Sequence, residues 1–214
     1  MLQIKHFQFN PFQENTYVLY NDNTNEAAVI DAGCLELMEK KALEQFIKEH
    51  DLVLKQVLNT HLHLDHQFGN KFLFDTFGIA PVAHPADEFM IEKMPSQAAA
   101  FGLQVTEKGQ PLCEYLEDNQ QIKIVGFDFR VIATPGHSPG GVCFYCEAQN
   151  LLIAGDTLFR CSIGRTDLPQ GNHETLIRSI KERLLILPDD TVVLCGHGPS
   201  TTIGDEKLYN GFLK

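Results

Sequence analysis

The alternation of apolar and polar positions predicts short strands at the start of the chain, followed by a helix. Apolar runs at 2–9, 16–20 and 27–30 are separated by turns rich in Asn and Asp, which is typical of strands. From 35 to 49 the apolar positions recur at helical spacing, so an amphipathic helix is expected there. A further apolar run, 57–60, leads into a polar cluster.

The rest of the chain continues this mixture of helices and strands. The spacing predicts helices over 70–77, 85–100 and 174–187, the last closed by Pro188. The remaining expected strands are 80–83, 122–125, 127–132, 141–146, 151–153 and, as the final strand, 191–195. Because no linker or repeat interrupts the pattern, it predicts a single α/β domain over residues 1–214.

Three histidines and an aspartate are crowded between His61 and His66. If the chain stays extended there, His61, His63 and Asp65 share one face. His66 then points elsewhere, which divides the segment into His61 with His63 and Asp65 with His66. Neutral imidazole and carboxylate are ligands that zinc, iron and manganese accept. A solvated histidine-rich turn is the alternative, and the regular spacing favours a metal site.

Three other apolar runs also end in a turn of small residues followed by a side chain that can bind a metal. These side chains are His137, Asp156 and His197. Loops at the carboxyl ends of strands converge in open α/β sheets. We therefore expect all three to meet the cluster between His61 and His66.

The motif His-x-His-x-Asp-His after an apolar strand resembles the signature of the metallo-β-lactamase superfamily, and the resemblance covers almost the whole chain. It implies an αββα sandwich with two metal ions at one edge of the paired sheets. Asp31 matches an acid that supports the site from behind. The implied ligands are His61, His63 and His137 for the first metal, Asp65, His66 and His197 for the second, and Asp156 bridging both.

The segments 155–160, 162–167 and 196–204 narrow the resemblance to the short, glyoxalase II-like branch. This implies a hydrolase of thioesters, with hydroxyacylglutathione as the expected substrate and two divalent ions as cofactors. Zinc comes first among these ions, with iron and manganese as alternatives. Few residues follow His197, so the separate C-terminal helical domain that holds glutathione in full-length glyoxalase II enzymes is not expected.

The expected mechanism uses a water molecule between two metals that share Asp156. The metals would lower the pKa of this water to about 7. The resulting hydroxide attacks the thioester carbonyl, and Asp65 is the catalytic residue that orients it. Arg165 is the expected substrate-binding residue. Its alternative role is an ion pair with Asp167, because exposed pairs of this kind are common.

Other functions remain open at this point. The stretch 164–167 is also similar to persulfide dioxygenases, which would use His61, His137 and Asp156 to hold a single iron. Another hydrolase of the same fold and a non-catalytic metal-binding protein are further alternatives. The sequence also contains a G-x-S-x-G motif around Ser138, but Pro139 lacks the N–H that a serine nucleophile needs beside it.

Charge and cysteine usage narrow the partners and the compartment. The formal net charge of −11 disfavours nucleic acid and anionic membranes, which select basic surfaces. There is no apolar stretch of membrane-spanning length, we expect no secretory signal, and the cysteines lie mostly in apolar runs. We expect reduced thiols, a cytoplasmic protein and a small-molecule thioester as partner. A homo-oligomer is compatible with the sequence.

Overall fold

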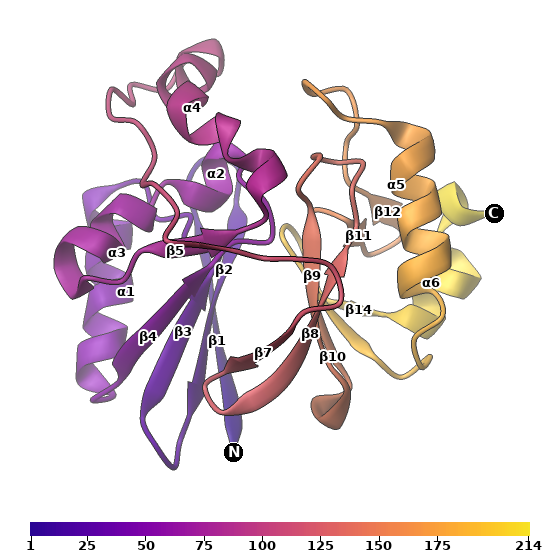
Figure 1. Cartoon of the computed structure of the whole chain (residues 1–214), viewed down its shortest axis with the longest axis horizontal. Helices are drawn as coiled ribbons and strands as arrows, with labels where there is room; N and C mark the ends of the chain where they lie inside the picture. Colours follow the sequence, from indigo (N-terminus) through magenta and orange to yellow (C-terminus); the bar gives the residue numbers. More distant parts are fainter.

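Two six-stranded sheets pack face to face, and helices cover the outer face of each (Figure 1). The computed structural model describes all residues from Met1 to Lys214. This arrangement confirms the expected αββα sandwich. None of the helices combines the length and the apolar composition needed to cross a membrane.

The first sheet has the order β1-β2-β3-β4-β5-β6. Its first three strands are antiparallel and the others are parallel. Helices α1 (Leu37–Glu49) and α3 (Asn70–Phe77) flank it, whereas α2 (Leu64–Gln67), the 3-10 turn η1 (Pro85–Asp87) and α4 (Phe89–Ala100) follow its strand ends. The strands are β1 (Leu2–Phe9), β2 (Glu14–Asn21), β3 (Glu26–Ile30), β4 (Val53–Leu58), β5 (Pro81–Ala83) and β6 (Glu114–Tyr115).

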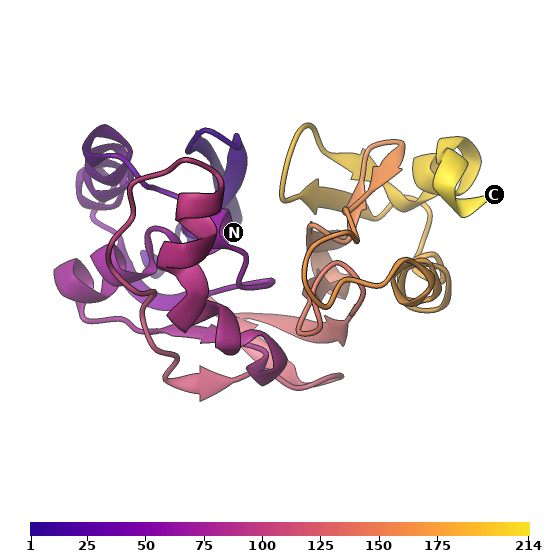
Figure 2. The ribbon, with the colours of Figure 1, turned by 90° about the horizontal axis from the view of Figure 1, so that it is seen from above.

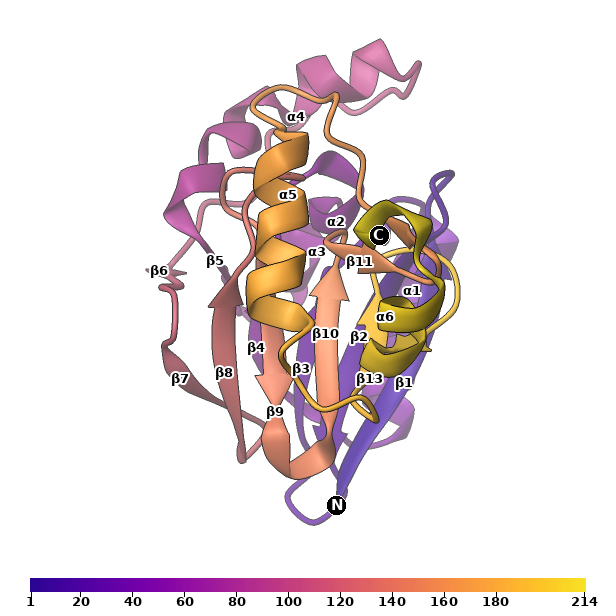
Figure 3. The ribbon, with the colours of Figure 1, turned by 90° about the vertical axis from the view of Figure 1, so that its right-hand side faces the viewer.

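The second sheet has the order β14-β13-β10-β9-β8-β7. Helix α5 (His173–Ser179), continued by a π-helical segment (Ile180–Leu184), and α6 (Ile203–Tyr209) cover its outer face (Figure 3). A small hairpin of β11 (Leu158–Phe159) and β12 (Ser162–Ile163) follows β10. The strands of the sheet are β7 (Gln121–Ile124), β8 (Phe127–Ala133), β9 (Val142–Cys146), β10 (Leu151–Gly155), β13 (Val192–Cys195) and β14 (Thr201–Thr202).

The alternation of side chains along the strands builds three layers of core. On β2, Leu19 belongs to the cluster between the sheets, whereas Val18 belongs to the cluster under α1. On β9, Cys146 faces the inter-sheet cluster and Cys143 faces the cluster under α5. Residues three apart on a strand face opposite sides, so this C-x-x-C is not a pair, and all cysteines are free.

The structure departs from the expected elements where they are short. The segment at 61–66 does not stay extended, because His63 is the N-cap of α2 and the chain turns helical at Leu64. The expected final strand, 191–195, is followed by β14 and by α6, which begins where the Thr202 side chain accepts a hydrogen bond from the Asp205 N–H. Strands of two residues are too short to show a period of two, which explains why β6, β11, β12 and β14 were not expected.

Candidate metal centre

Four strand ends, one from the first sheet and three from the second, deliver candidate ligands to one edge of the sandwich. His61 follows β4, His137 follows β8, Asp156 follows β10 and His197 follows β13. Figure 2 looks onto this edge, with α4 on one side and the β11–β12 hairpin on the other. The convergence expected from the sequence is therefore present in the fold.

His61, His63 and His137 form the first group of candidate ligands. One ring nitrogen of each lies within 4.8 Å of the others. His63 Nδ1 lies 2.7 Å from His137 Nε2, which lies 3.2 Å from His61 Nε2. All three rings are buried, so these nitrogens face one another rather than solvent.

Asp65, His66 and His197 form the second group, again with ligand atoms within 4.8 Å of one another. Asp65 Oδ2 lies 3.3 Å from His197 Nε2 and 3.8 Å from His66 Nε2. Because α2 begins at Leu64, Asp65 and His66 lie on its first turn, next to His197. The two groups adjoin each other, since the ring centroids of His61 and His66 are 4.1 Å apart.

Asp156 lies between the two groups. Its Oδ1 is 3.4 Å from His66 Nε2, and its Oδ2 is 3.5 Å from both His137 Nε2 and His197 Nε2. The carboxylate therefore faces both groups at once, as a bridging ligand would. Gly196 permits this approach, because a Cβ there would collide with the Asp156 carboxylate.

Hydrogen bonds at the opposite ring nitrogen fix the orientation of several histidines. His137 Nδ1 donates to the Arg165 carbonyl at 2.7 Å, and His197 Nδ1 donates to the Phe12 carbonyl at 3.0 Å. His66 Nδ1 donates to Asp31 Oδ2 at 3.1 Å. In each ring this leaves Nε2 as the acceptor nitrogen, which is how proteins orient histidines that bind metals.

Asp31 supports the site as the resemblance implied. Besides His66, its carboxylate accepts hydrogen bonds from the Thr60 N–H at 2.7 Å and the Thr60 hydroxyl at 2.6 Å. Its backbone is left-handed, with φ of 53°. Asp31 thus ties the end of β3 to the start of the histidine motif.

The electrostatics of the cluster combine neutral imidazoles with ionised carboxylates. Burial and neighbouring imidazoles hold the pKa of His61 well below its usual range and lower the pKa of His63 to about 3. Burial alone would raise the pKa of Asp156, but His66 and His197 hold it well below its ordinary value. Burial alone would lower the pKa of His66, but the facing carboxylates of Asp156 and Asp65 raise it well above its usual value. The first group is therefore neutral, and the second balances its carboxylates with protons.

Two buried atoms test whether a metal fits here. His66 Nε2 and Asp156 Oδ1 are inaccessible to solvent and have no hydrogen-bond partner. Unsatisfied buried polar atoms are costly, and a cation would satisfy both. The nitrogen and carboxylate donors are the set that zinc, iron and manganese accept. The residues fit two divalent ions, and the ligand assignment stays a prediction.

Asp87 and Glu14 are buried carboxylates beside the site that the sequence analysis missed. Asp87 accepts hydrogen bonds from the Ser138 hydroxyl at 2.7 Å, the Gly140 N–H at 2.6 Å and the Leu62 N–H at 3.2 Å. Burial raises the pKa of Asp87. It joins the loop of His61 and His63 to the loop of His137. No motif marks a lone acid of this kind.

Glu14, at the start of β2, lies behind His66. Its Oε2 accepts a hydrogen bond from the Thr16 hydroxyl at 2.8 Å, and its Oε1 lies 3.9 Å from His66 Nδ1 without a hydrogen bond. Burial raises the pKa of Glu14 well above its usual value. A buried carboxyl group is therefore part of the support of His66, and the sequence gives no signal for it.

A cleft of about 380 Å³ opens above the candidate ligands. Arg165 lines it, and its Nε and Nη2 each lie 2.7 Å from a carboxylate oxygen of Asp167. The ion pair considered from the sequence is therefore present. Ser138 is buried and donates its hydroxyl to Asp87, so its oxygen is held away from the cleft.

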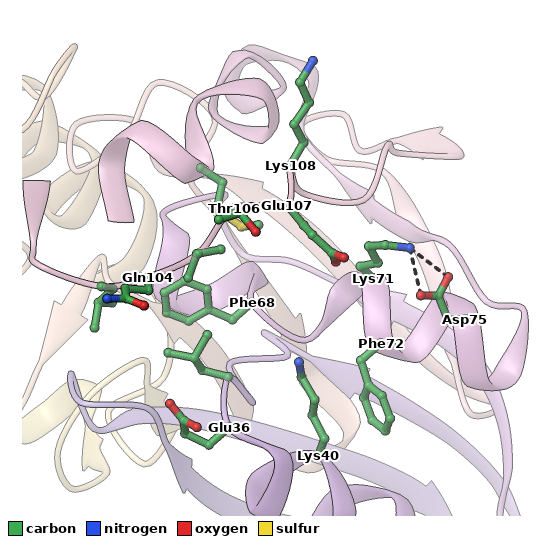
Figure 4. A pocket seen from close by; sticks show the side chains of 14 residues that line it. Glu36, Lys40, Phe68, Lys71, Phe72, Asp75, Gln104, Thr106, Glu107 and Lys108 are labelled. Carbon is green, nitrogen blue, oxygen red and sulfur yellow. Dashed lines mark hydrogen bonds and ion pairs between the residues drawn. The ribbon is translucent and has the colours of Figure 1, made fainter. Parts of the chain in front are cut away.

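A larger cavity of about 540 Å³ lies between α1, α3 and the loop after α4 (Figure 4). None of the candidate ligands lines it. Its lining contains as many acidic side chains as lysines, and the Lys71 ammonium lies 2.8 Å from the Asp75 carboxylate. Because this cavity lacks the candidate ligands, the cleft above the histidines is the candidate active site.

Known proteins share this architecture and sequence. The family model of the Metallo-beta-lactamase superfamily matches residues 9–197. The hydroxyacylglutathione hydrolase GloC of Haemophilus influenzae is 41% identical over 203 residues, which cover 94% of this chain and 93% of that protein. The range matched by the family model spans every candidate ligand, from His61 to His197.

Two solved structures are similar over nearly the full length of both chains. The BLEG-1 B3 metallo-β-lactamase superposes with a TM-score of 0.88 and 37% identity, covering 99% of this chain and 100% of that one. TTHA1623 in a di-iron-bound form gives a TM-score of 0.86 and 35% identity, covering 98% and 100%. Together with the His/Asp cluster, the fold indicates a dinuclear metal site. The chain belongs to the metallo-β-lactamase superfamily.

Proposed function

We propose that this protein is a metal-dependent thioester hydrolase of the hydroxyacylglutathione hydrolase type. The observation that carries the proposal is the pair of ligand groups facing one carboxylate, Asp156, at the floor of a cleft. Membership in a superfamily of metallo-hydrolases supports an enzyme. The similarity to a hydroxyacylglutathione hydrolase supports the thioester specificity.

In this proposal the first group would hold one divalent ion, the second group would hold another, and Asp156 would supply a carboxylate ligand to each. Two such ions would polarise a carbonyl and make water a nucleophile at neutral pH. Zinc is the first metal to test, with iron and manganese as alternatives, because His/Asp sites discriminate weakly among them. The proposed setting is cytoplasmic, with a small-molecule thioester as the partner.

The protein's own groups position the reactants. Asp65 lines the cleft, and despite its burial the neighbouring His66 and His197 lower its pKa, so it is an ionised acceptor for a water proton. The thiolate that leaves from a thioester is a weak base and needs little help from a general acid. Arg165 lies at the mouth, where we propose that it contacts the thiol portion of the substrate.

The test measures metal content and hydrolysis of S-lactoylglutathione by the same preparation. We expect about two metals per chain and hydrolysis that is lost on chelation and restored by metal. Oxygen uptake with glutathione persulfide, no thioester hydrolysis and one iron per chain would instead establish the dioxygenase. Metal binding without either turnover would overturn both enzymatic functions.

A further inference from the structure

The walls of the cleft differ in character from its floor. The floor consists of all the candidate ligands except His61 and His66, whereas every other lining residue except Ser162 and Arg165 is apolar. The apolar side chains come from separate parts of the chain, on both sides of the floor. They are Phe12, Leu64, Phe101, Phe159, Ile163 and Leu168.

Phe12 is held at a fixed position relative to the metal centre. Its carbonyl accepts the His197 Nδ1–H at 3.0 Å, and its N–H donates to Asn10 Oδ1 at 3.0 Å. Asn10 in turn donates to the carbonyl of Asp65 at 3.1 Å. The backbone of Phe12 is thus tied to two candidate ligands, and its side chain lines one side of the cleft.

Phe101 extends this side from the end of α4. Its ring meets Phe12 edge to face, with centroids 5.3 Å apart and planes at 84°. Phe101 is nevertheless 45% exposed, so the aromatic pair presents uncovered apolar surface beside the reacting centre. Exposed apolar surface next to a cleft is typical of a ligand-binding surface.

No lysine or arginine with a free head group lines the cleft to attract a charged substrate group. Arg165 is the one Lys or Arg that lines it, and Asp167 occupies the fork of its guanidinium. The lysines of the second cavity belong to a different space (Figure 4). The two spaces lie on different sides of the segment that contains α2, because Phe68 lines the second cavity and Leu64 lines the cleft.

We infer that the substrates of this cleft carry an uncharged, apolar group beside the reacting thioester, and that Phe12 and Phe101 determine this specificity. The inference rests on the proposed hydrolase function. The apolar group packs on the aromatic pair while the carbonyl lies over the floor. Selectivity then comes from the apolar group rather than from the charges of glutathione.

Binding of thioethers tests the inference without catalysis, because a thioether has no bond for the enzyme to cleave. Calorimetry would compare S-benzylglutathione with S-methylglutathione on the metal-loaded protein. We expect the benzyl compound to bind about tenfold more tightly, since it buries a phenyl group against aromatic walls. Equal dissociation constants would overturn the inference.

Variants assign the effect to the aromatic pair. Phe101→Ala should reduce the benzyl preference to about twofold, and Phe101→Leu should keep part of it because an apolar contact remains. Phe74→Ala is the matched control, since Phe74 is a 40% exposed phenylalanine on α3 that does not line the cleft. A preference that survives in Phe101→Ala, or that is lost equally in Phe74→Ala, would refute the role of Phe101.

Kinetics then separates the two sources of an apolar group. Mandeloyl and lactoyl thioesters of glutathione differ in the acyl part, and lactoyl thioesters of benzyl mercaptan and N-acetylcysteamine differ in the thiol part. We expect kcat/KM to rise about tenfold with the phenyl group in at least one pair. Comparable values in both pairs would overturn the inference, whereas absence of hydrolysis of all four would overturn the proposed function.

Discussion

Asp87→Asn tests whether the two histidine loops depend on one buried carboxylate. Oδ1 of Asp87 accepts from the Gly140 N–H, while Oδ2 accepts from both the Ser138 hydroxyl and the Leu62 N–H. An amide offers one acceptor oxygen. The Ser138 hydroxyl can rotate to accept from the new NH₂ group, but one backbone N–H then loses its partner.

The magnitude follows from that lost acceptor. One buried N–H without a partner costs about 1–3 kcal/mol, and the removal of a buried charge offsets part of this. We therefore expect Asp87→Asn to destabilise the metal-free protein by about 2 kcal/mol. In a chain of this size, that lowers Tm by about 4–8 °C. Because Leu62 separates two candidate ligands and Ser138 follows a third, metal affinity should fall by about 10–100-fold.

The assay combines thermal unfolding of the metal-free protein with metal titration. Ser138→Ala is the matched control, because it removes a donor to Asp87 but leaves no backbone N–H without a partner, so its effects should be smaller on both measures. An Asp87→Asn protein with parental Tm and parental metal affinity would refute the role given to this carboxylate.

The pH dependence supplies an independent check of the same residue. Burial raises the pKa of Asp87, so the folded protein holds its proton at pH values where the unfolded chain has lost it. The stability that Asp87 contributes is therefore complete below about pH 4, the pKa of an unfolded aspartate, and declines as pH rises through the raised value. The stability difference between parent and Asp87→Asn should decrease over that interval, and a flat difference would contradict the assignment.

Five variants test the candidate site. Asp156→Ala should reduce metal content from about two ions per chain, by elemental analysis, because both ligand groups face this carboxylate. Asp65→Asn should lower kcat by about 100-fold or more, while Ser138→Ala should stay within a few-fold in steady-state assays. With S-lactoylglutathione as substrate, Arg165→Ala should raise KM a few-fold. Asp167→Ala should lower KM, because it frees the guanidinium fork of Arg165 for the substrate. If both variants change KM in the same direction, Arg165 does not contact the substrate.

The candidate ligands could be found from the sequence because each has a local signal. The cluster from His61 to His66 is dense enough to be recognised alone, and His137, Asp156 and His197 each follow an apolar run that ends in small residues. Strand ends are where side chains from distant segments meet, so these local signals also predicted the convergence. The sandwich itself followed from the resemblance, and the structure confirms it.

The support of the site could not be found in the same way. Asp87, Glu14 and the buried Glu206 act through contacts with residues far away in sequence. Glu206 of α6, for example, accepts hydrogen bonds from the Cys161 N–H in the turn of the β11–β12 hairpin, at 3.0 Å. A single acid in an ordinary context has no spacing that distinguishes it from a surface residue. The apolar cleft walls likewise combine segments that become neighbours only in the folded chain.

Burial of the cluster implies that metal binding and stability are linked. Without metal, Asp156 Oδ1 and His66 Nε2 stay buried without a hydrogen bond and face each other at 3.4 Å, which offsets part of a cost of about 1–3 kcal/mol for each polar group. A metal that binds only the folded chain, and not the unfolded one, increases the free energy of unfolding by RT ln(1 + [M]/Kd). At a metal concentration of a hundred times Kd, this increase is about 2.7 kcal/mol. Zinc at that concentration should therefore raise Tm by about 5–11 °C, and chelation should reverse the rise. His66→Ala, which removes a ligand and one unpaired atom together, should show a smaller rise. An unchanged Tm on saturation with zinc, iron or manganese would mean that the cluster does not bind metal as assigned.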